Sequence, residues 1–101
     1  MPPNKVDILE HETGDGERLS GAGAADRSAQ LDVGALYTLF VGAVDITFAT
    51  GGSAVDADAS SIPLGAFTKH DLQIVDGGDY VSIFPYDGSS TAVANIVKSS
   101  P

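Results

Sequence analysis

Short runs of β-branched and aromatic residues, separated by turns rich in Gly and Asp, recur from residue 31 to the end of the chain. Such runs favour strands, and the turn residues favour sharp reversals of the backbone. In VDITFAT, Val44, Ile46 and Phe48 alternate with other side chains, which is the period-two pattern of a strand with one buried face. No long helical pattern competes with these runs. The sequence therefore predicts an all-β fold, a small antiparallel β-sandwich or barrel.

The turns suggest how the strands follow one another. We expect strands at residues 35–41, 44–50, 62–67, 71–75, 80–86 and 91–98. Gly42 and Ala43 separate the first two runs, which predicts either a tight hairpin or one long strand with a bulge. The DGGD at residues 76–79 is a strong hairpin signal, so the strands on either side of it are expected to pair. The expected core residues are Ile46, Phe48, Leu72, Ile74, Val81, Ile83, Val93 and Val97.

The composition changes near residue 30. Residues 1–30 hold all three Glu and both Arg but few large apolar side chains, whereas every later acid is Asp. We therefore expect an extended N-terminal arm over residues 1–30 and one β-sandwich domain over residues 31–101. The arm is either a solvated tail or a segment that lies on a neighbouring subunit. Val6, Ile8 and Leu9 favour the second, since a solvated tail has no need for them.

The charge and composition narrow the classes of partner. The chain has 101 residues, which is one domain at most, and a net charge of -9. Phosphate backbones are bound by clustered Lys and Arg, so neither a nucleic acid nor an anionic membrane is an expected partner. The apolar run around residues 36–44 is far shorter than a membrane helix. With no basic and apolar leader visible, we expect a protein made and used without export.

The residue types that carry chemistry are not gathered into a recognisable pattern. His70 precedes Asp71, but neighbours on a strand point to opposite faces, so the two cannot readily form a catalytic pair. Asp56 and Asp58 could offer oxygens to calcium, yet the rest of a calcium loop is missing. No nucleophile elbow or phosphate loop is present. We expect no enzyme activity, no cofactor and no metal site.

One predicted strand is apolar on both faces. Val81 and Ile83 would face one side of YVSIFPY, with Tyr80 and Phe84 on the other. The first face would meet the domain's own core, and the second could meet a partner. The expected partner-binding residues are Val6, Ile8, Leu9, Tyr80 and Phe84.

Residues 44–98 run from VDITFAT through SSIPLGAF and DGGDYVSIF to GSSTAVANIVKS. This order resembles the small β-sandwich virion proteins of tailed bacteriophages, which often act as decoration, or cement, proteins. The resemblance implies a non-enzymatic structural protein that binds the coat-protein shell in many copies, commonly as a trimer. It also implies a place on the capsid exterior after synthesis in the host cytoplasm. The acidic charge fits an outer surface, because an inner one would face packaged DNA.

Two alternatives remain open from the sequence. One is another virion position, such as a head–tail connector or a tail component. The other is a carbohydrate- or receptor-binding β module, although the chain has no Trp to stack on a sugar and its three Tyr fall in predicted strands.

Overall fold

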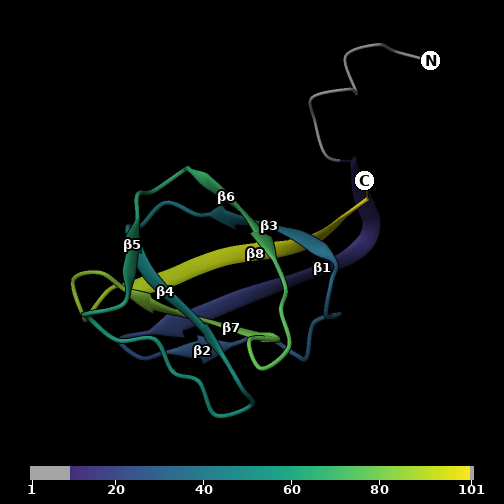
Figure 1. Cartoon of the computed structure of the whole chain (residues 1–101). Helices are drawn as coiled ribbons and strands as arrows, with labels where there is room; N and C mark the ends of the chain where they lie inside the picture. Colours follow the sequence, from purple (N-terminus) through teal and green to yellow (C-terminus); the bar gives the residue numbers. More distant parts are fainter. Residues whose placement is uncertain (1–9, 101) are drawn as a thin grey trace.

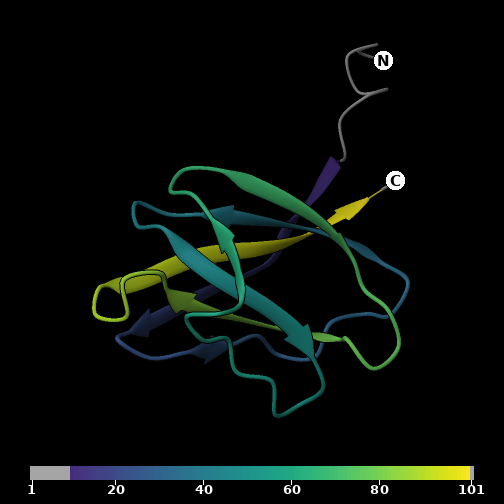
Figure 2. The ribbon, with the colours of Figure 1, turned by 60° about the vertical axis from the view of Figure 1, so that its left-hand side comes forward.

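The structure, a computed structural model, describes residues 10–100, with side chains described for residues 16–99. Two sheets pack face to face as the layers of a sandwich (Figures 1 and 2), so the predicted all-β fold is confirmed in its sandwich form. The strands are β1 (Glu10–Ala22), β2 (Asp26–Arg27), β3 (Leu36–Val41), β4 (Ile46–Gly51), β5 (Ile62–Leu64), β6 (Lys69–Gln73), β7 (Tyr80–Pro85) and β8 (Thr91–Ser100).

Both sheets have four strands, and every pairing is antiparallel. The first sheet, called sheet A below, has the order β1-β8-β3-β6. The second, sheet B, has the order β2-β7-β4-β5. The longest pairing joins β1 to β8, which brings the beginning and the end of the described chain side by side (Figure 1).

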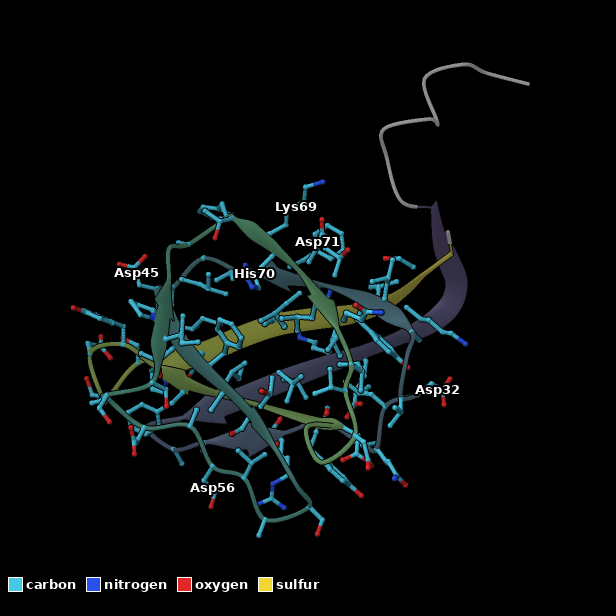
Figure 3. All side chains as sticks on the ribbon, in the orientation of Figure 1. Asp32, Asp45, Asp56, Lys69, His70 and Asp71 are labelled. Atoms are coloured by element: carbon cyan, nitrogen blue, oxygen red, sulfur yellow. The ribbon has the colours of Figure 1, made fainter. Side chains whose placement is uncertain are left out.

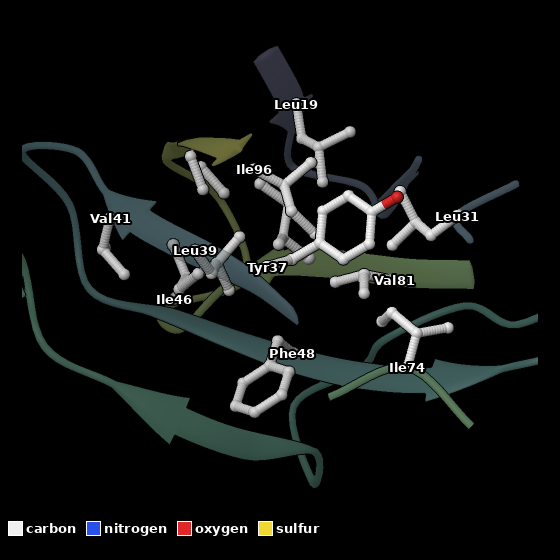
Figure 4. Packing of buried hydrophobic residues seen from close by; sticks show 13 residues of the cluster. Leu19, Leu31, Tyr37, Leu39, Val41, Ile46, Phe48, Ile74, Val81 and Ile96 are labelled. Atoms are coloured by element: carbon white, nitrogen blue, oxygen red, sulfur yellow. The ribbon is translucent and has the colours of Figure 1, made fainter. Parts of the chain in front are cut away.

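The core lies between the two inner faces (Figure 4). Sheet A contributes Leu19, Leu39 and Ile96, and sheet B contributes Ile46 and Ile83, all at most 1% exposed. These side chains alternate with outward ones along their strands, as period two requires. The Tyr37 ring is also buried, and its hydroxyl oxygen accepts a hydrogen bond from the backbone N–H of Asp32 at 2.9 Å.

The predicted hairpin across residues 76–79 is wrong. β6 pairs with β3 in sheet A, whereas β7 pairs with β2 and β4 in sheet B. The DGGD segment therefore carries the chain from one layer to the other. Gly77, with φ of 81°, supplies the left-handed backbone that this turn needs.

The connection between β3 and β4 is also different from both predicted alternatives. The chain leaves sheet A after Val41 and enters sheet B at Ile46, so it forms neither a hairpin nor one bulged strand. The crossing is fixed by the Gly42 N–H, which donates to the Val93 carbonyl at 2.8 Å. Two strong strand patterns joined by a four-residue link, residues 42–45, thus belong to different layers.

The domain boundary expected at residue 30 is not where the sandwich begins. β1 and β2 are members of the two sheets, and Leu19 of β1 is completely buried in the core. The carboxylate of Glu17 accepts the Ala29 N–H, at 3.0 and 3.1 Å from its two oxygens, which ties β1 to the segment after β2. Residues 10–30 therefore belong to the sandwich, and residues 1–9 of the predicted arm lie outside the described residues.

Two predicted core residues are misplaced by one position along β8. Ala92, Ala94 and Ile96 point inward, so Val93 and Val97 lie on the outer face of sheet A, half-buried. In TAVANIVK, apolar side chains occupy both faces, and hydrophobicity alone therefore does not reveal which face is buried. The remaining predicted core residues are buried or, for Leu72, packed against the cluster.

Candidate partner-binding surfaces

The outer face of sheet B carries the predicted contact residues Tyr80 and Phe84. Both are half-buried, while Ser82 between them is completely buried. Val81 and Ile83 point into the core, as predicted from their alternation. The outer face of β7, which bears Tyr80 and Phe84, is therefore partly covered by another part of the chain.

The cover is the chain's own loop. Residues 52–61, called the covering loop below, cross the outer face of sheet B between β4 and β5. Its Ala57 is buried, and the Ala57 N–H donates to the Ser82 hydroxyl at 2.9 Å. The Thr47 hydroxyl, from β4, donates to the Asp58 carbonyl at 2.7 Å. The second layer over β7 is thus supplied in part by this loop, which contacts Ser82, and the half-buried Tyr80 and Phe84 on the same face are only partly accessible to a partner.

Arg27 of β2 fastens the covering loop. Its Nε donates to the Val55 carbonyl and one Nη to the Ser53 carbonyl, both at 2.7 Å. The other Nη pairs with the Asp56 carboxylate at 2.9 Å. A planar guanidinium with donors in a fixed fork suits three acceptors spread along one loop, which an ammonium group could not bind in the same way.

The two carboxylates of the DAD motif serve different partners. Asp56 pairs with Arg27, and Asp58 accepts hydrogen bonds from the Ser60 hydroxyl and the Ser60 N–H. The Ser60 hydroxyl bond, followed by its backbone bond, lowers the pKa of Asp58. Among residues 16–99, whose side chains the structure describes, no group of three or more His, Cys, Asp or Glu side chains gathers where it could hold a metal ion.

His70 and Asp71 point to opposite faces of β6, as their adjacency predicted (Figure 3). The His70 ring turns inward to the Phe48 ring, with 5.2 Å between centroids. The Asp71 carboxylate lies outside and accepts a hydrogen bond from the Thr38 hydroxyl at 2.7 Å. The two side chains therefore do not form a pair.

A pocket of about 300 Å³ lies beside β1, lined in part by Glu17, Asp32 and Tyr37. Its polar groups already have partners within the chain. Glu17 accepts the Ala29 N–H, Asp32 receives the Lys98 ammonium at 3.2 Å, and Tyr37 accepts the Asp32 N–H. These bonds hold the segment after β2 against sheet A, so the pocket's polar lining serves the fold.

One end of the sandwich exposes aromatic rings, which the sequence interpretation did not single out. Phe67 is 80% exposed and Tyr86 is 57% exposed, and Asp45 lies between their loops. The Asp45 carboxylate accepts the Ala66 N–H at 2.8 Å, and its carbonyl accepts the Tyr86 N–H at 3.0 Å. The Phe67 N–H donates to the Gly42 carbonyl at 2.9 Å. Both rings are therefore presented on anchored turns.

Phe67 has a φ of 57°, the left-handed region that bulky residues rarely enter. A strained backbone under an exposed aromatic ring is a feature found at sites of interaction. We expected Phe67 at the end of a strand over residues 62–67, but β5 ends at Leu64 and Phe67 lies in the turn that follows. Gly65 in GAFT was the available sequence signal for that turn.

The predicted arm residues Val6, Ile8 and Leu9 lie outside the described residues, so their contact role stays a prediction. Between residues 10 and 100 there is no helix long and apolar enough to cross a membrane. No protein-family model matches the chain, and neither a curated protein nor a solved structure shows significant similarity to it.

Proposed function

We propose that the protein is a non-enzymatic structural component of a tailed-phage virion, a decoration protein that binds the coat-protein shell in many copies. The observation that carries the proposal is the arrangement of residues 44–98, the stretch with the resemblance. This stretch forms β4 to β8, strands shared between both layers of a small sandwich. An architecture of this size and class supports the role that the resemblance implies.

The contacts inside the sandwich agree with a structural role. The carboxylates of Asp45, Asp56 and Asp58 accept N–H, hydroxyl or guanidinium donors within the fold. The net charge of -9 would keep free copies soluble and apart before assembly. The proposed partners are coat-protein subunits and further copies of the chain, at the capsid exterior.

Residues Val6, Ile8 and Leu9 are the proposed anchor on the shell. An apolar segment that becomes ordered on a neighbour adds contact area, and the gain multiplies when one subunit touches several others. Tyr80 and Phe84 are proposed as a weaker contribution, because both side chains are already half-buried within the chain.

The test is binding to shells assembled from the coat protein of a phage that carries this protein. The protein is mixed with intact shells, and bound copies are counted after sedimentation. We expect many copies per shell, and at least about tenfold weaker binding when Val6, Ile8 and Leu9 are all changed to Ser. The matched control changes Pro2, Pro3 and Asn4 to Ser in the same segment, and should bind like the original protein.

Two results would count against parts of this proposal. Equal binding by the Val6/Ile8/Leu9 variant and its control would remove the anchor. Absence of binding to shells, with binding to an isolated connector or tail instead, would replace decoration by another virion position.

A carbohydrate-binding module is the second candidate, supported by the exposed Tyr86 ring beside Asp45. These two residues, with Pro63 and Leu64, line a shallow pocket of about 270 Å³. An exposed aromatic ring next to a carboxylate is a suitable combination for stacking on a sugar and accepting its hydroxyl groups. Glycan-array binding that is lost in Tyr86→Ala would favour this candidate, and shell binding that survives Tyr86→Ala would favour decoration.

A further inference from the structure

A sandwich of two open sheets has four edge strands, and in the described part of this chain they differ in how well they are closed. β2 has two residues, and β5 has three with Pro63 at its centre, so neither offers a long edge. β1 is interrupted between His11 and Gly16, and its Ser20 N–H is bonded by the Asp26 carboxylate at 2.8 Å. β6 has five residues and alternates between exposed and half-buried side chains.

The backbone groups of β6 that point away from the sheet can be identified from the bonds on its other side. The Ile74 N–H donates to the Ala35 carbonyl, and the Thr68 carbonyl accepts the Val41 N–H. In an antiparallel ladder, alternate residues bond to the same neighbour, so residues 68, 70, 72 and 74 face β3. Lys69, Asp71 and Gln73 therefore direct their N–H and C=O groups toward the free edge.

We propose that β6 pairs with β6 of a second copy, antiparallel about a twofold axis, with His70 opposite His70 of the second copy. In this register Lys69 of each copy lies opposite Asp71 of the other, and these are the positions whose backbone groups face the free edge. Lys69 and Asp71 are both exposed on the outer side of β6 (Figure 3), so the two pairs of opposite charge would lie on the outer face of the combined sheet. Sheet A would then continue through both copies, with four strands from each.

The charges of Lys69 and Asp71 favour this register over the two adjacent antiparallel registers. If the twofold axis lay at Asp71, the two Asp71 carboxylates would lie opposite each other. If it lay at Lys69, the two Lys69 ammonium groups would lie opposite each other. Opposite charges across a strand pair stabilise the pair and like charges destabilise it. Lys and other charged residues commonly protect an edge from pairing, but Lys69 and Asp71, two residues apart and opposite in sign, are complementary to their own copy.

The exposed apolar residues beside β6 give independent support. Phe67 precedes β6 and is 80% exposed, and Val75 follows it and is 60% exposed. An antiparallel pairing centred on His70 places Phe67 of one copy opposite Gln73 of the other copy, two residues before Val75. The same twofold axis places these two exposed apolar residues near each other at both ends of the charged pairs.

This inference does not depend on a virion role. It predicts a closed dimer, because a twofold contact uses the edge of both copies and leaves none for a third. A dimer also differs from the trimer that the resemblance implies.

The test exchanges the two charges in the full chain and measures mass by analytical ultracentrifugation over a range of concentrations. We expect a dimer for the original protein, and about tenfold weaker association for Lys69→Asp or Asp71→Lys alone, because like charges then face each other twice. The double variant Lys69→Asp/Asp71→Lys restores opposite pairs and should dimerise again. An equimolar mixture of the two single variants should form a mixed dimer for the same reason.

Arg18→Asp is the matched control, since Arg18 is exposed on the outer face of the same sheet at its opposite edge. It should leave the dimer unchanged, and circular dichroism should show that every variant stays folded. A monomer at all concentrations, a trimer, or a dimer that both single substitutions leave intact would overturn the proposal.

Discussion

Individual Asp carboxylates bind the loops of this protein to its sheets. Asp87 accepts the N–H groups of Ser89 and Ser90 at 2.9 and 2.8 Å, a local turn. Asp26 and Asp45 instead accept N–H groups from other elements of the fold, those of Ser20 in β1 and of Ala66. The abundance of Asp predicted turns, because its side chain bonds nearby backbone. The bonds of Asp26 and Asp45 to other elements could not be predicted, because they depend on how the two sheets pack together.

Asp87 gives a pH-dependent prediction. Hydrogen bonds from the Ser90 hydroxyl, then from the Ser90 and Ser89 N–H groups, lower its pKa from 3.8 to about 2. A carboxyl with a lowered pKa in the folded state stabilises the protein above pH 3.8, and this contribution is lost as the pH falls through about 2. Asp87→Asn should therefore lower the melting temperature at neutral pH. The difference in melting temperature between this variant and the original protein should become smaller in acid. A difference that stays constant over this pH range would contradict the assignment.

The backbone of Phe67 gives a second prediction at this scale. A left-handed conformation costs a residue other than Gly about 1–2 kcal/mol, and the exposed ring contributes little burial in return. Phe67→Gly should raise the free energy of unfolding by up to about 1 kcal/mol, after the entropy that Gly costs. Phe67→Ala keeps the strain and is the control. Urea denaturation at high dilution measures both, and equal effects of the two substitutions would exclude strain as the cause.

At the scale of elements, the strands were predictable but their partners were not. Alternation along residues 44–50 and 80–86 placed Ile46, Phe48, Val81 and Ile83 in the core correctly, because it follows from the strand itself. The hairpin expected between β6 and β7 failed because a Gly-rich turn suits a connection between layers as well as one within a sheet. β1 was missed because GERLSGA contains one large apolar side chain, Leu19, and gains its stability from pairing with β8.

Leu19 tests whether β1 is part of the sandwich. Its side chain is completely buried between the sheets, so Leu19→Ala should lower the free energy of unfolding by about 3 kcal/mol. Ser20→Ala, at the exposed neighbour, should change it by less than about 0.5 kcal/mol. Chemical denaturation measures both. Similar small effects would mean that β1 belongs to a detachable arm, as the sequence first indicated.

Arg27 tests the covering loop. Arg27→Ala removes three hydrogen bonds to residues 53–56 and should destabilise the fold by about 1–2 kcal/mol, since the side chain is partly exposed. Hydrogen exchange at the Ala57 N–H should become faster, because this group belongs to the covering loop and is protected by its bond to the Ser82 hydroxyl. Arg27→Lys keeps the charge without the fork and should recover little of the loss. Unchanged exchange in both variants would show that the loop is held by other contacts.

At the scale of the whole molecule, the all-β class followed from the sequence and the topology did not. Period-two patterns identify strands and faces, but the pairing of β1 with β8 joins opposite ends of the described chain. The same limit applied to the candidate surfaces. Tyr80 and Phe84 were predicted on a second covered face of β7. The chain's own covering loop forms part of that cover, because Ala57 bonds to Ser82 of β7 and Asp58 bonds to Thr47 of β4. Phe67 and the open edge of β6 became visible only in three dimensions.

The proposed decoration role is tested most directly by the number of copies in a purified virus particle that carries this protein. Quantitative mass spectrometry of intact particles gives the ratio of this chain to the coat protein. A ratio near that of a shell-covering component, comparable with the coat protein itself, is the predicted result. A ratio corresponding to a single ring at one vertex, or absence from the particle, would contradict the account.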